Sequence, residues 1–275
     1  MTTTTLLKLG GELLEDAAAM RVAAAAIVRL AAAGPLVVVH GGGRAIDAEL
    51  RARGAEPRFV DGLRVTDQAA LDTVVSVLAG RTNTSLVAAI GVAGGRAIGL
   101  TGADGQIGLS RRAAPLETVA GDLADLGLVG EPISADGSLL RDLIAARAIP
   151  VVASIGVDDH GVLLNVNADV LAAHLARVLP ADRLIVAGGT AGVLDADGTT
   201  VTTLAVDAID RMTQSGVAHS GMIAKLVACR GALTGGVRDV RIVSGRGVVD
   251  YASAPGTTLV ATAPIGETPI VGIRS

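Results

Sequence analysis

The stretch that decides the fold is Val37-Val38-Val39-His40-Gly41-Gly42-Gly43-Arg44. Three successive β-branched residues are typical of a buried strand, and a helical pattern begins at Arg44. Glycines at such a strand-to-helix junction let backbone N–H groups approach a ligand closely, and the start of the helix adds partial positive charge. The stretch therefore predicts an anion-binding turn, with an ordinary tight turn as the alternative.

The residues on either side show the same alternation of strand and helix. Residues 3–9 are expected to form a strand that ends at Gly10-Gly11, residues 16–33 an alanine-rich helix, and residues 36–39 the next strand. A β-α-β-α order is typical of a parallel sheet covered by helices. We therefore expect an α/β fold built on a mainly parallel open sheet.

The rest of the chain continues this pattern without a low-complexity linker. Further strands are expected at 96–100, 150–154, 183–187, 237–243 and 257–262. Further helices are expected at 67–78, 83–92, 139–147, 170–179, 206–214 and 222–233. Hairpins are expected at 58–66, 106–131 and 157–164. We expect one domain over residues 1–275, with lobes of about 1–159 and 160–262 that share one continuous sheet.

Composition narrows the class of protein. The 23 basic and 27 acidic residues give a net charge of −4 without a basic stripe, which argues against a nucleic-acid partner. Cys229 is the only cysteine, so an internal disulfide is excluded and a reducing, cytoplasmic location is expected. The four histidines show no metal-ligand spacing, so no side-chain metal cluster is expected. No signal peptide is visible, and the apolar segment 22–39 is too interrupted to span a membrane.

Several well-known motifs of nucleotide-binding and hydrolytic enzymes are absent from the sequence. The pattern G-x-x-x-x-G-K-[ST] of P-loop proteins is absent, and G-x-G-x-x-G fails because Ile46 stands at its third glycine position. There is no G-x-S-x-G and no H-E-x-x-H. The glycine turns thus indicate anion binding by some other arrangement.

Polar residues recur where strands end and helices begin. Ligands of parallel sheets bind in the crevice outside the carboxyl ends of the strands. The residues placed there are Lys8, Arg64, Asn165, Asp169 and Lys225, together with the glycine turns. Lys8 stands out because it lies within an apolar strand, where a lysine is costly unless it meets an anion. An exposed lysine on a fraying edge strand is the alternative.

Two lysines, glycine amides and an aspartate suit phosphoryl transfer, in which positioning and charge neutralisation supply most of the catalysis. Asp169 would fix the two ammonium groups or bind magnesium, or it would simply stabilise the first turn of a helix. Asn165 has an alternative role as a turn residue. Arg64 has an alternative role as a surface residue of a hairpin.

Six motifs, in this order and spacing, resemble the acetylglutamate kinases of the amino acid kinase family. The resemblance runs from about residue 6 to 260. The motifs are Lys-Leu-Gly-Gly (8–11), Val-His-Gly-Gly-Gly (39–43), Gly-Leu-Arg-Val-Thr-Asp (62–67), Asp-Leu-Gly-Leu-Val-Gly-Glu (125–131), Asn-Val-Asn-Ala-Asp (165–169) and Gly-Met-Ile-Ala-Lys (221–225).

The resemblance implies a three-layer αβα sandwich, with substrate in the N-terminal lobe and nucleotide in the C-terminal lobe. It implies Mg2+-dependent transfer of the ATP γ-phosphoryl group to the side-chain carboxylate of N-acetyl-L-glutamate in arginine biosynthesis. The implied catalytic residues are Lys8, Lys225 and Asp169. The implied substrate-binding residues are Gly42, Gly43, Arg64 and Asn165. The implied phosphate- and nucleotide-binding residues are Gly10, Gly11, Gly188, Gly189, Gly192 and Met222.

Such chemistry needs no general base, because a carboxylate nucleophile with a pKa of about 4 is already ionised at neutral pH. The chain departs from the family pattern at Gly188-Gly189-Thr190-Ala191, where a carboxylate is common. It also has Ala103 and Thr84 where lysine is common, and Ala224 where proline is common. It lacks the long N-terminal helix of arginine-inhibited members, so we expect a homodimer without arginine feedback.

Two other functions compete with this interpretation. One is a kinase for aminoadipate or glutamate held on a carrier protein, whose motifs differ at 62–67 and 165–169. The other is a non-catalytic amino-acid-binding paralogue, suggested by the altered turn at Gly189. Retention of Lys8, Lys225 and Asp169 argues against the second.

Overall fold

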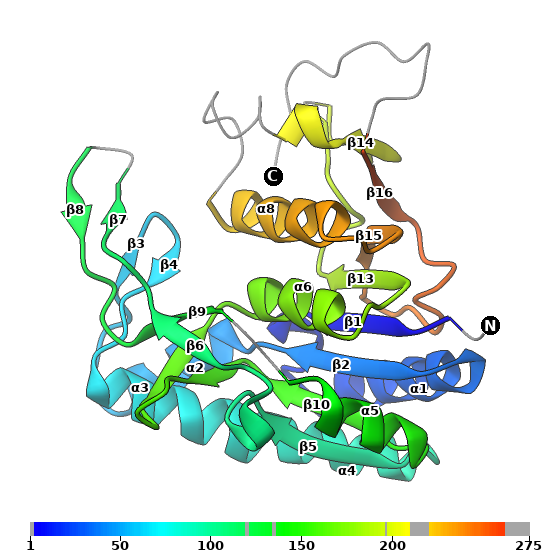
Figure 1. Cartoon of the computed structure of the whole chain (residues 1–275), viewed down its shortest axis with the longest axis horizontal. Helices are drawn as coiled ribbons and strands as arrows, with labels where there is room; N and C mark the ends of the chain where they lie inside the picture. The colour runs from blue at the N-terminus through cyan, green and yellow to red at the C-terminus, as the bar shows by residue number, and fades with distance from the viewer. Residues whose placement is uncertain (1–2, 119–120, 134–135, 196, 210–219, 262–275) are drawn as a thin grey trace.

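The computed structural model describes residues 3–118, 121–133, 136–195, 197–209 and 220–261. Its centre is an eight-stranded sheet with the strand order β14-β16-β15-β13-β1-β2-β10-β5 (Figure 1). The strands are β1 (Thr5–Leu9), β2 (Leu36–His40), β5 (Ala97–Thr101), β10 (Ile149–Ala153), β13 (Arg183–Gly188), β14 (Thr203–Ala205), β15 (Asp239–Ser244) and β16 (Gly256–Val260). Neighbouring strands are parallel except β15 and β16.

Helices cover both faces of this sheet, and the strand residues alternate between the two cores. Leu6 and Val37 pack with α6 (Ala168–Val178) and α8 (Ser220–Thr234) on one face. Leu7 and Val38 pack with α1 (Ala17–Ala33) and α4 (Thr84–Val92) on the other. Successive strand residues point to opposite faces, so near-continuous apolar strands bury both. The predicted three-layer αβα sandwich is confirmed (Figure 1).

Smaller elements lie at one end of the large sheet. A four-stranded sheet has the order β11-β12-β9-β6, and two hairpins pair β3 with β4 and β7 with β8. Figure 1 shows both hairpins on the side of the molecule opposite the N-terminus. The strands are β3 (Phe59–Val60), β4 (Leu63–Arg64), β6 (Ser110–Arg112), β7 (Leu116–Glu117), β8 (Leu123–Ala124), β9 (Val129–Pro132), β11 (Ile155–Val157) and β12 (Leu163–Val166). The remaining short elements are α2 (Gly43–Ala52), α5 (Ser138–Ala145), η1 (Gly11–Leu13) and η3 (Asp104–Gln106).

One prediction about the helices was wrong. The sequence favoured separate helices at 67–78 and 83–92, but residues 68–92 form one helix. It consists of α3 (Gln68–Val75), a π-helical segment η2 (Ser76–Asn83) and α4. Gly80 does not interrupt the helix because the wider π turn continues through it, burying Val77 and Leu78.

The same helix is long and apolar enough to cross a membrane by length and composition. Several of its apolar side chains pack inside the protein, whereas Val92 at its end is exposed. Leu86 and Ile90 are fully buried in the core beneath α1, and Val74 packs in a third core with α2. This packing is typical of a core helix of a layered fold.

One further strand was not predicted from the sequence, and one predicted helix is described only in part. The short strand β14 was not predicted, because three residues carry too little periodicity to identify it. The helix expected at 206–214 is described only at residues 206–209, where it is helical, and the rest lies outside the described residues. Strands of the expected N-terminal range (β1, β2, β5, β10) and of the expected C-terminal range (β13, β14, β15, β16) share the large sheet.

Candidate active site

Two glycine turns meet where β1 and β2 end side by side in the sheet. A Cβ atom placed on Gly11 would lie 2.7 Å from the Cα atom of Gly42, which no side chain tolerates. The Gly10 N–H donates to the Ala187 carbonyl at 2.8 Å, which joins the first turn to the end of β13. The turns are therefore packed backbone to backbone, and they leave a pocket above the strand ends.

Lys8 and Asp169 form an ion pair at the base of this pocket. The Lys8 Nζ atom lies 2.9 Å from Asp169 Oδ1, and both side chains are about nine-tenths buried. Asp169 is fixed in the first turn of α6, whose N-cap Asn167 accepts hydrogen bonds from the Asp169 and Val170 N–H groups. The anion that Lys8 was expected to meet is thus the buried carboxylate of Asp169. Burial of an unpaired ammonium would cost several kcal/mol.

We name this hollow, of about 270 Å³, the acceptor pocket. It brings together eight residues that the sequence placed in a site. They are Lys8, Gly10, Gly11, Gly42, Gly43, Arg64, Asn165 and Asp169.

Arg64 enters the acceptor pocket from the β3–β4 hairpin and is held from three sides. Its Nη2 atom lies 2.6 Å from Asp47 Oδ1 and donates to the Gly43 carbonyl at 3.3 Å. Its guanidinium carbon lies 4.7 Å from the centre of the Phe59 ring. The side chain is 8 % exposed, and Nη1 is buried without a hydrogen-bond partner among the described residues. A buried guanidinium N–H without a partner is suited to an anionic ligand. Arg64 is therefore no simple surface residue.

Asn165 lies opposite, on β12. Its Nδ2 atom donates to Thr66 Oγ1 at 3.0 Å, and Thr66 is fully buried. This contact ties β12 to the segment that carries Arg64. The amide is fixed in orientation and leaves its carbonyl oxygen available to a ligand.

A second hollow of about 410 Å³, which we name the donor pocket, lies on the side of β13 and α8. It is lined by Glu12, Arg44, Gly189, Thr190, Gly192, Leu194, Met222, Lys225 and Arg246. Lys225 is also close to the end of β13, because a Cβ atom on Gly188 would lie 3.4 Å from its Nζ atom. Gly192 has a φ of +102°, and a Cβ there would lie 2.5 Å from Thr257 Oγ1. The donor pocket therefore gathers four predicted site residues, Gly189, Gly192, Met222 and Lys225, and Gly188 lies next to Lys225 at the end of β13.

Sequence reasoning missed several side chains that shape the two pockets. Glu12, Arg44 and Arg246 line the donor pocket, and Asp47 orients Arg64. Glu12 and Arg44 each directly follow a glycine turn, which was a usable signal. No local pattern marks Arg246, which reaches the pocket from the loop after β15.

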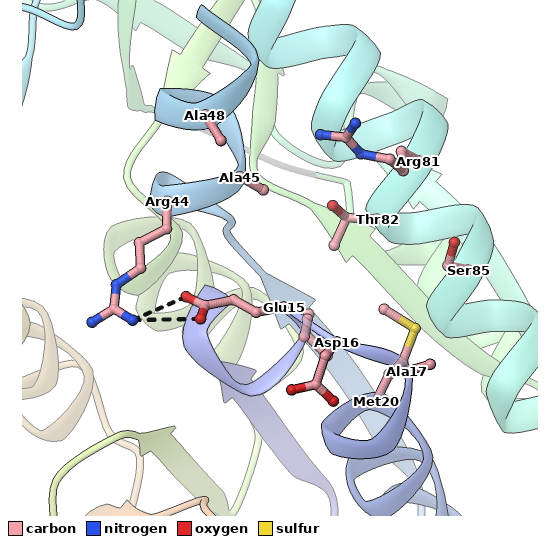
Figure 2. A pocket seen from close by; sticks show the side chains of 11 residues that line it. Glu15, Asp16, Ala17, Met20, Arg44, Ala45, Ala48, Arg81, Thr82 and Ser85 are labelled. Atoms are coloured by element: carbon pink, nitrogen blue, oxygen red, sulfur yellow. Dashed lines mark hydrogen bonds and ion pairs between the residues drawn. The ribbon is translucent and has the colours of Figure 1, made fainter. Parts of the chain in front are cut away.

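A further cavity of about 560 Å³ lies beside the two pockets, between the start of α1, α2 and η2 (Figure 2). Within it, Arg44 Nη1 donates to both carboxylate oxygens of Glu15, at 3.2 and 3.4 Å. The cavity is lined by neither lysine of the site and not by Asp169. Arg44 is the residue it shares with the donor pocket.

His40 is the last residue of β2 and is fully buried. Burial lowers its pKa to about 4, so the imidazole is neutral at physiological pH. Its Nε2 atom lies 3.1 Å from Asn83 Nδ2, and Asn83 also donates to the Val151 carbonyl at 2.9 Å. His40 therefore joins β2 to the π-helical segment and lines neither pocket.

No group of three or more His, Cys, Asp or Glu side chains that could hold a metal occurs in the part of the chain described by the structure. A divalent cation in this site would depend on ligand phosphates for most of its coordination. Magnesium is commonly held in that way, with one or two protein carboxylates and the phosphates of a nucleotide.

Comparison with known proteins agrees with this geometry. The model of the amino acid kinase family matches residues 3–244. The chain belongs to the amino acid kinase family. Acetylglutamate kinase of Methanoculleus marisnigri is 39% identical over 247 residues, covering 88% of this chain and 86% of that protein. Acetylglutamate kinase of Dinoroseobacter shibae is 41% identical over 242 residues, covering 88% and 81%.

A solved structure of comparable fold is that of N-acetylglutamate synthase from Neisseria gonorrhoeae, complexed with coenzyme A and N-acetyl-glutamate. It superposes with a TM-score of 0.80 at 26% identity, covering 95% of this chain and 60% of that one. The superposition thus extends over nearly all of this chain and over three-fifths of the synthase chain.

Proposed function

We propose that the chain transfers the γ-phosphoryl group of ATP to the side-chain carboxylate of N-acetyl-L-glutamate, which gives N-acetyl-L-glutamyl 5-phosphate for arginine biosynthesis. One observation carries this proposal: two adjoining pockets each contain a lysine, and one of them also holds a guanidinium N–H that has no partner among the described residues. Acetylglutamate kinases are about 40% identical over most of the chain.

In this proposal, Lys8 and Lys225 stabilise the transferring phosphoryl group from the acceptor and donor sides. Asp169 holds Lys8 in place through the 2.9 Å ion pair. The Gly11 amide would be offered to the same group, whereas the Gly10 N–H is already donated to the Ala187 carbonyl, so Gly10 would contribute by leaving space for the phosphoryl group. Because the transition state spreads negative charge over the moving group and both flanking oxygens, fixed cations between two anions lower the barrier.

The acceptor would be held by Arg64, Asn165, Gly42 and Gly43. Its second carboxylate suits the Arg64 guanidinium, whose Nη1 has no partner among the described residues. A Cβ on Gly43 would meet nothing within 4 Å, so this glycine leaves room for ligand against the start of α2. The positive end of α2 favours the carboxylate that reacts.

The nucleotide would occupy the donor pocket, with Gly188, Gly189, Gly192 and Met222 beside it. ATP would bring Mg2+, which supplies charge neutralisation between the phosphates. No general base is required, because the acceptor carboxylate is ionised at neutral pH. Buried, neutral His40 fits a structural role.

We further propose that residues 1–159 form the substrate-binding lobe and residues 160–262 the nucleotide-binding lobe. We expect a cytoplasmic homodimer without arginine feedback. Light scattering should give twice the mass of one chain, and millimolar arginine should leave activity unchanged. A hexamer, or inhibition by arginine, contradicts this part of the proposal.

The test of the main proposal is an ATP- and Mg2+-dependent hydroxamate assay, which traps the acyl phosphate. N-acetyl-L-glutamate, glutamate and N-acetylaspartate are compared, with Lys8→Ala as the control. Activity on N-acetyl-L-glutamate alone, lost in Lys8→Ala, is expected. Activity that appears only with a carrier-bound aminoadipate or glutamate would replace the proposal, and a folded chain that binds acetylglutamate without turnover would indicate a binding paralogue.

A further inference from the structure

Glu12 occupies a position between the two pockets. Among the residues that the structure describes, it is the one that lines both the acceptor pocket and the donor pocket. It lies in η1, the short turn that directly follows Gly10 after β1. A carboxylate is therefore located where the phosphoryl group of the proposed reaction has to pass.

Contacts with glycine backbones hold the Glu12 carboxylate in this place. Its Oε1 atom accepts a hydrogen bond from the Gly189 N–H at 2.7 Å. A Cβ atom on Gly10 would lie 2.5 Å from either carboxylate oxygen, and a Cβ on Gly188 would lie 3.3 Å from Oε1. The space that Glu12 fills thus depends on the bare backbones of these glycines.

Of the two acidic side chains that line the pockets, Asp169 is already paired with Lys8. Glu12 uses only Oε1, and Oε2 makes no hydrogen bond or ion pair with any described residue. Glu12 is partly exposed and lines both pockets. Glu12 therefore offers a carboxylate oxygen that no described protein group uses.

A carboxylate at this point repels both the phosphates of a nucleotide and the acceptor carboxylate. At a few ångströms, such repulsion amounts to about 1 to 4 kcal/mol, depending on solvent access. A divalent cation between the groups reverses the sign of this interaction. Magnesium readily combines one protein carboxylate with nucleotide phosphates and waters, which fits a site without a larger cluster of ligands.

We infer that Glu12 supplies the protein oxygen that holds the divalent cation of the nucleotide at the junction of the two pockets. The inference rests on the proposed function. It also gives a reason for the missing carboxylate at Gly189: the acidic group reaches the same place from the neighbouring strand. A Cβ on Gly189 would lie 3.4 Å from Glu12 Cγ, so a side chain there would compete for the space.

The test measures binding of the non-hydrolysable analogue AMP-PNP by calorimetry, once with Mg2+ and once with EDTA. Glu12→Gln removes the charge but keeps an oxygen that can accept from the Gly189 N–H. The quantity compared is the dissociation constant in EDTA divided by that in Mg2+. We expect this ratio to fall about tenfold or more in Glu12→Gln, as for loss of a metal ligand's support. Glu56→Gln, at an exposed pair with Arg51, is the matched control and should keep the wild-type ratio.

A swap tests the location of the carboxylate. Glu12→Ser with Gly189→Asp removes the acid after β1 and places one after β13, in the space that the shorter serine vacates. We expect this double variant to regain most of the Mg2+ dependence lost in Glu12→Gln. A double variant as independent of Mg2+ as Glu12→Gln overturns the exchange of position.

The outcomes separate this inference from the proposed function. Equal ratios in wild type and Glu12→Gln, with the analogue bound in both, overturn the role of Glu12 and leave the kinase proposal intact. A wild-type chain that binds the analogue in neither buffer contradicts the kinase proposal, and the role of Glu12 falls with it.

Discussion

The Asp169 carboxylate has two tasks at the scale of a single residue: it neutralises Lys8 and it sets the direction of the ammonium group. Both side chains are about nine-tenths buried. Asp169→Asn would leave a buried ammonium without its counter-charge, which costs about 3–5 kcal/mol when a buried pair is broken from one side. We expect a lower melting temperature and at least a hundredfold loss of kcat in the hydroxamate assay.

The matched control for Asp169→Asn is Glu131→Gln. Glu131 pairs with Arg111 at 3.0 Å on the surface, where both side chains are about half exposed or more. Such pairs contribute about 0–1 kcal/mol. If Asp169→Asn melts and reacts like Glu131→Gln, the buried pair has neither of the roles assigned to it.

His40 makes stability depend on pH. Burial lowers its pKa to about 4 in the folded protein, against 6.5 for the ordinary side chain. Between these values His40 is protonated in the unfolded chain but not in the folded chain. The contribution of His40 to the free energy of unfolding therefore rises from pH 4 to pH 6.5 and is constant above pH 6.5. The full difference is about 3 kcal/mol. Urea unfolding across this range should show the slope in wild type and its loss in His40→Gln.

The control for His40 is His160→Gln, at a surface turn where the imidazole is 81% exposed. This variant should keep the wild-type dependence of unfolding free energy on pH. A slope that persists unchanged in His40→Gln would assign the dependence to other groups.

At the scale of elements, the two glycine turns differ in what they tolerate. A Cβ on Gly11 would meet the Gly42 backbone at 2.7 Å, whereas a Cβ on Gly43 meets nothing within 4 Å. Gly11→Ala must push the ends of β1 and β2 apart, so we expect a clear loss of thermal stability. Gly43→Ala should melt like wild type but raise the KM for N-acetyl-L-glutamate, because its methyl group enters the acceptor pocket. Equal melting temperatures for the two variants would contradict the close contact of the turns.

Some helices and strands could be predicted from the sequence, and others could not. Strands β1 and β2 and their glycine turns were predictable, because local apolar runs and glycines define both the strand and its end. Lys8 was singled out because it lies within an apolar strand, and the structure pairs it with Asp169, which the sequence placed at the start of a helix. The helix at 68–92 was not, because Gly80 suggests a break and a π turn has no simple sequence pattern.

Other residues of the site depend on contacts between distant segments. Glu12 accepts a hydrogen bond from Gly189, 177 positions away, and Asp47 on α2 forms an ion pair with Arg64 on β4. Each is an ordinary surface-type residue in the sequence, and only the sheet order brings it to a pocket. The three-dimensional packing identifies such side chains, whereas the periodicity of the sequence does not.

At the scale of the whole molecule, Cys229 offers a probe of unfolding that the protein already contains. The thiol is fully buried in α8, and burial raises its pKa to about 12. The reactive species is the thiolate, so the folded protein should not react with a thiol reagent at neutral pH. Modification should occur only when the core around α6 and α8 opens, and its rate should rise with urea as unfolding does.

Ligands extend this prediction to the site. Lys225 lies on the same helix as Cys229, so occupation of the donor pocket should stabilise the folded state that protects the thiol. AMP-PNP with Mg2+ at a hundred times its dissociation constant should slow modification about a hundredfold, as expected when the ligand binds only the folded chain. Rapid labelling of the unliganded protein without denaturant would instead show that α8 opens locally, without unfolding of the sheet.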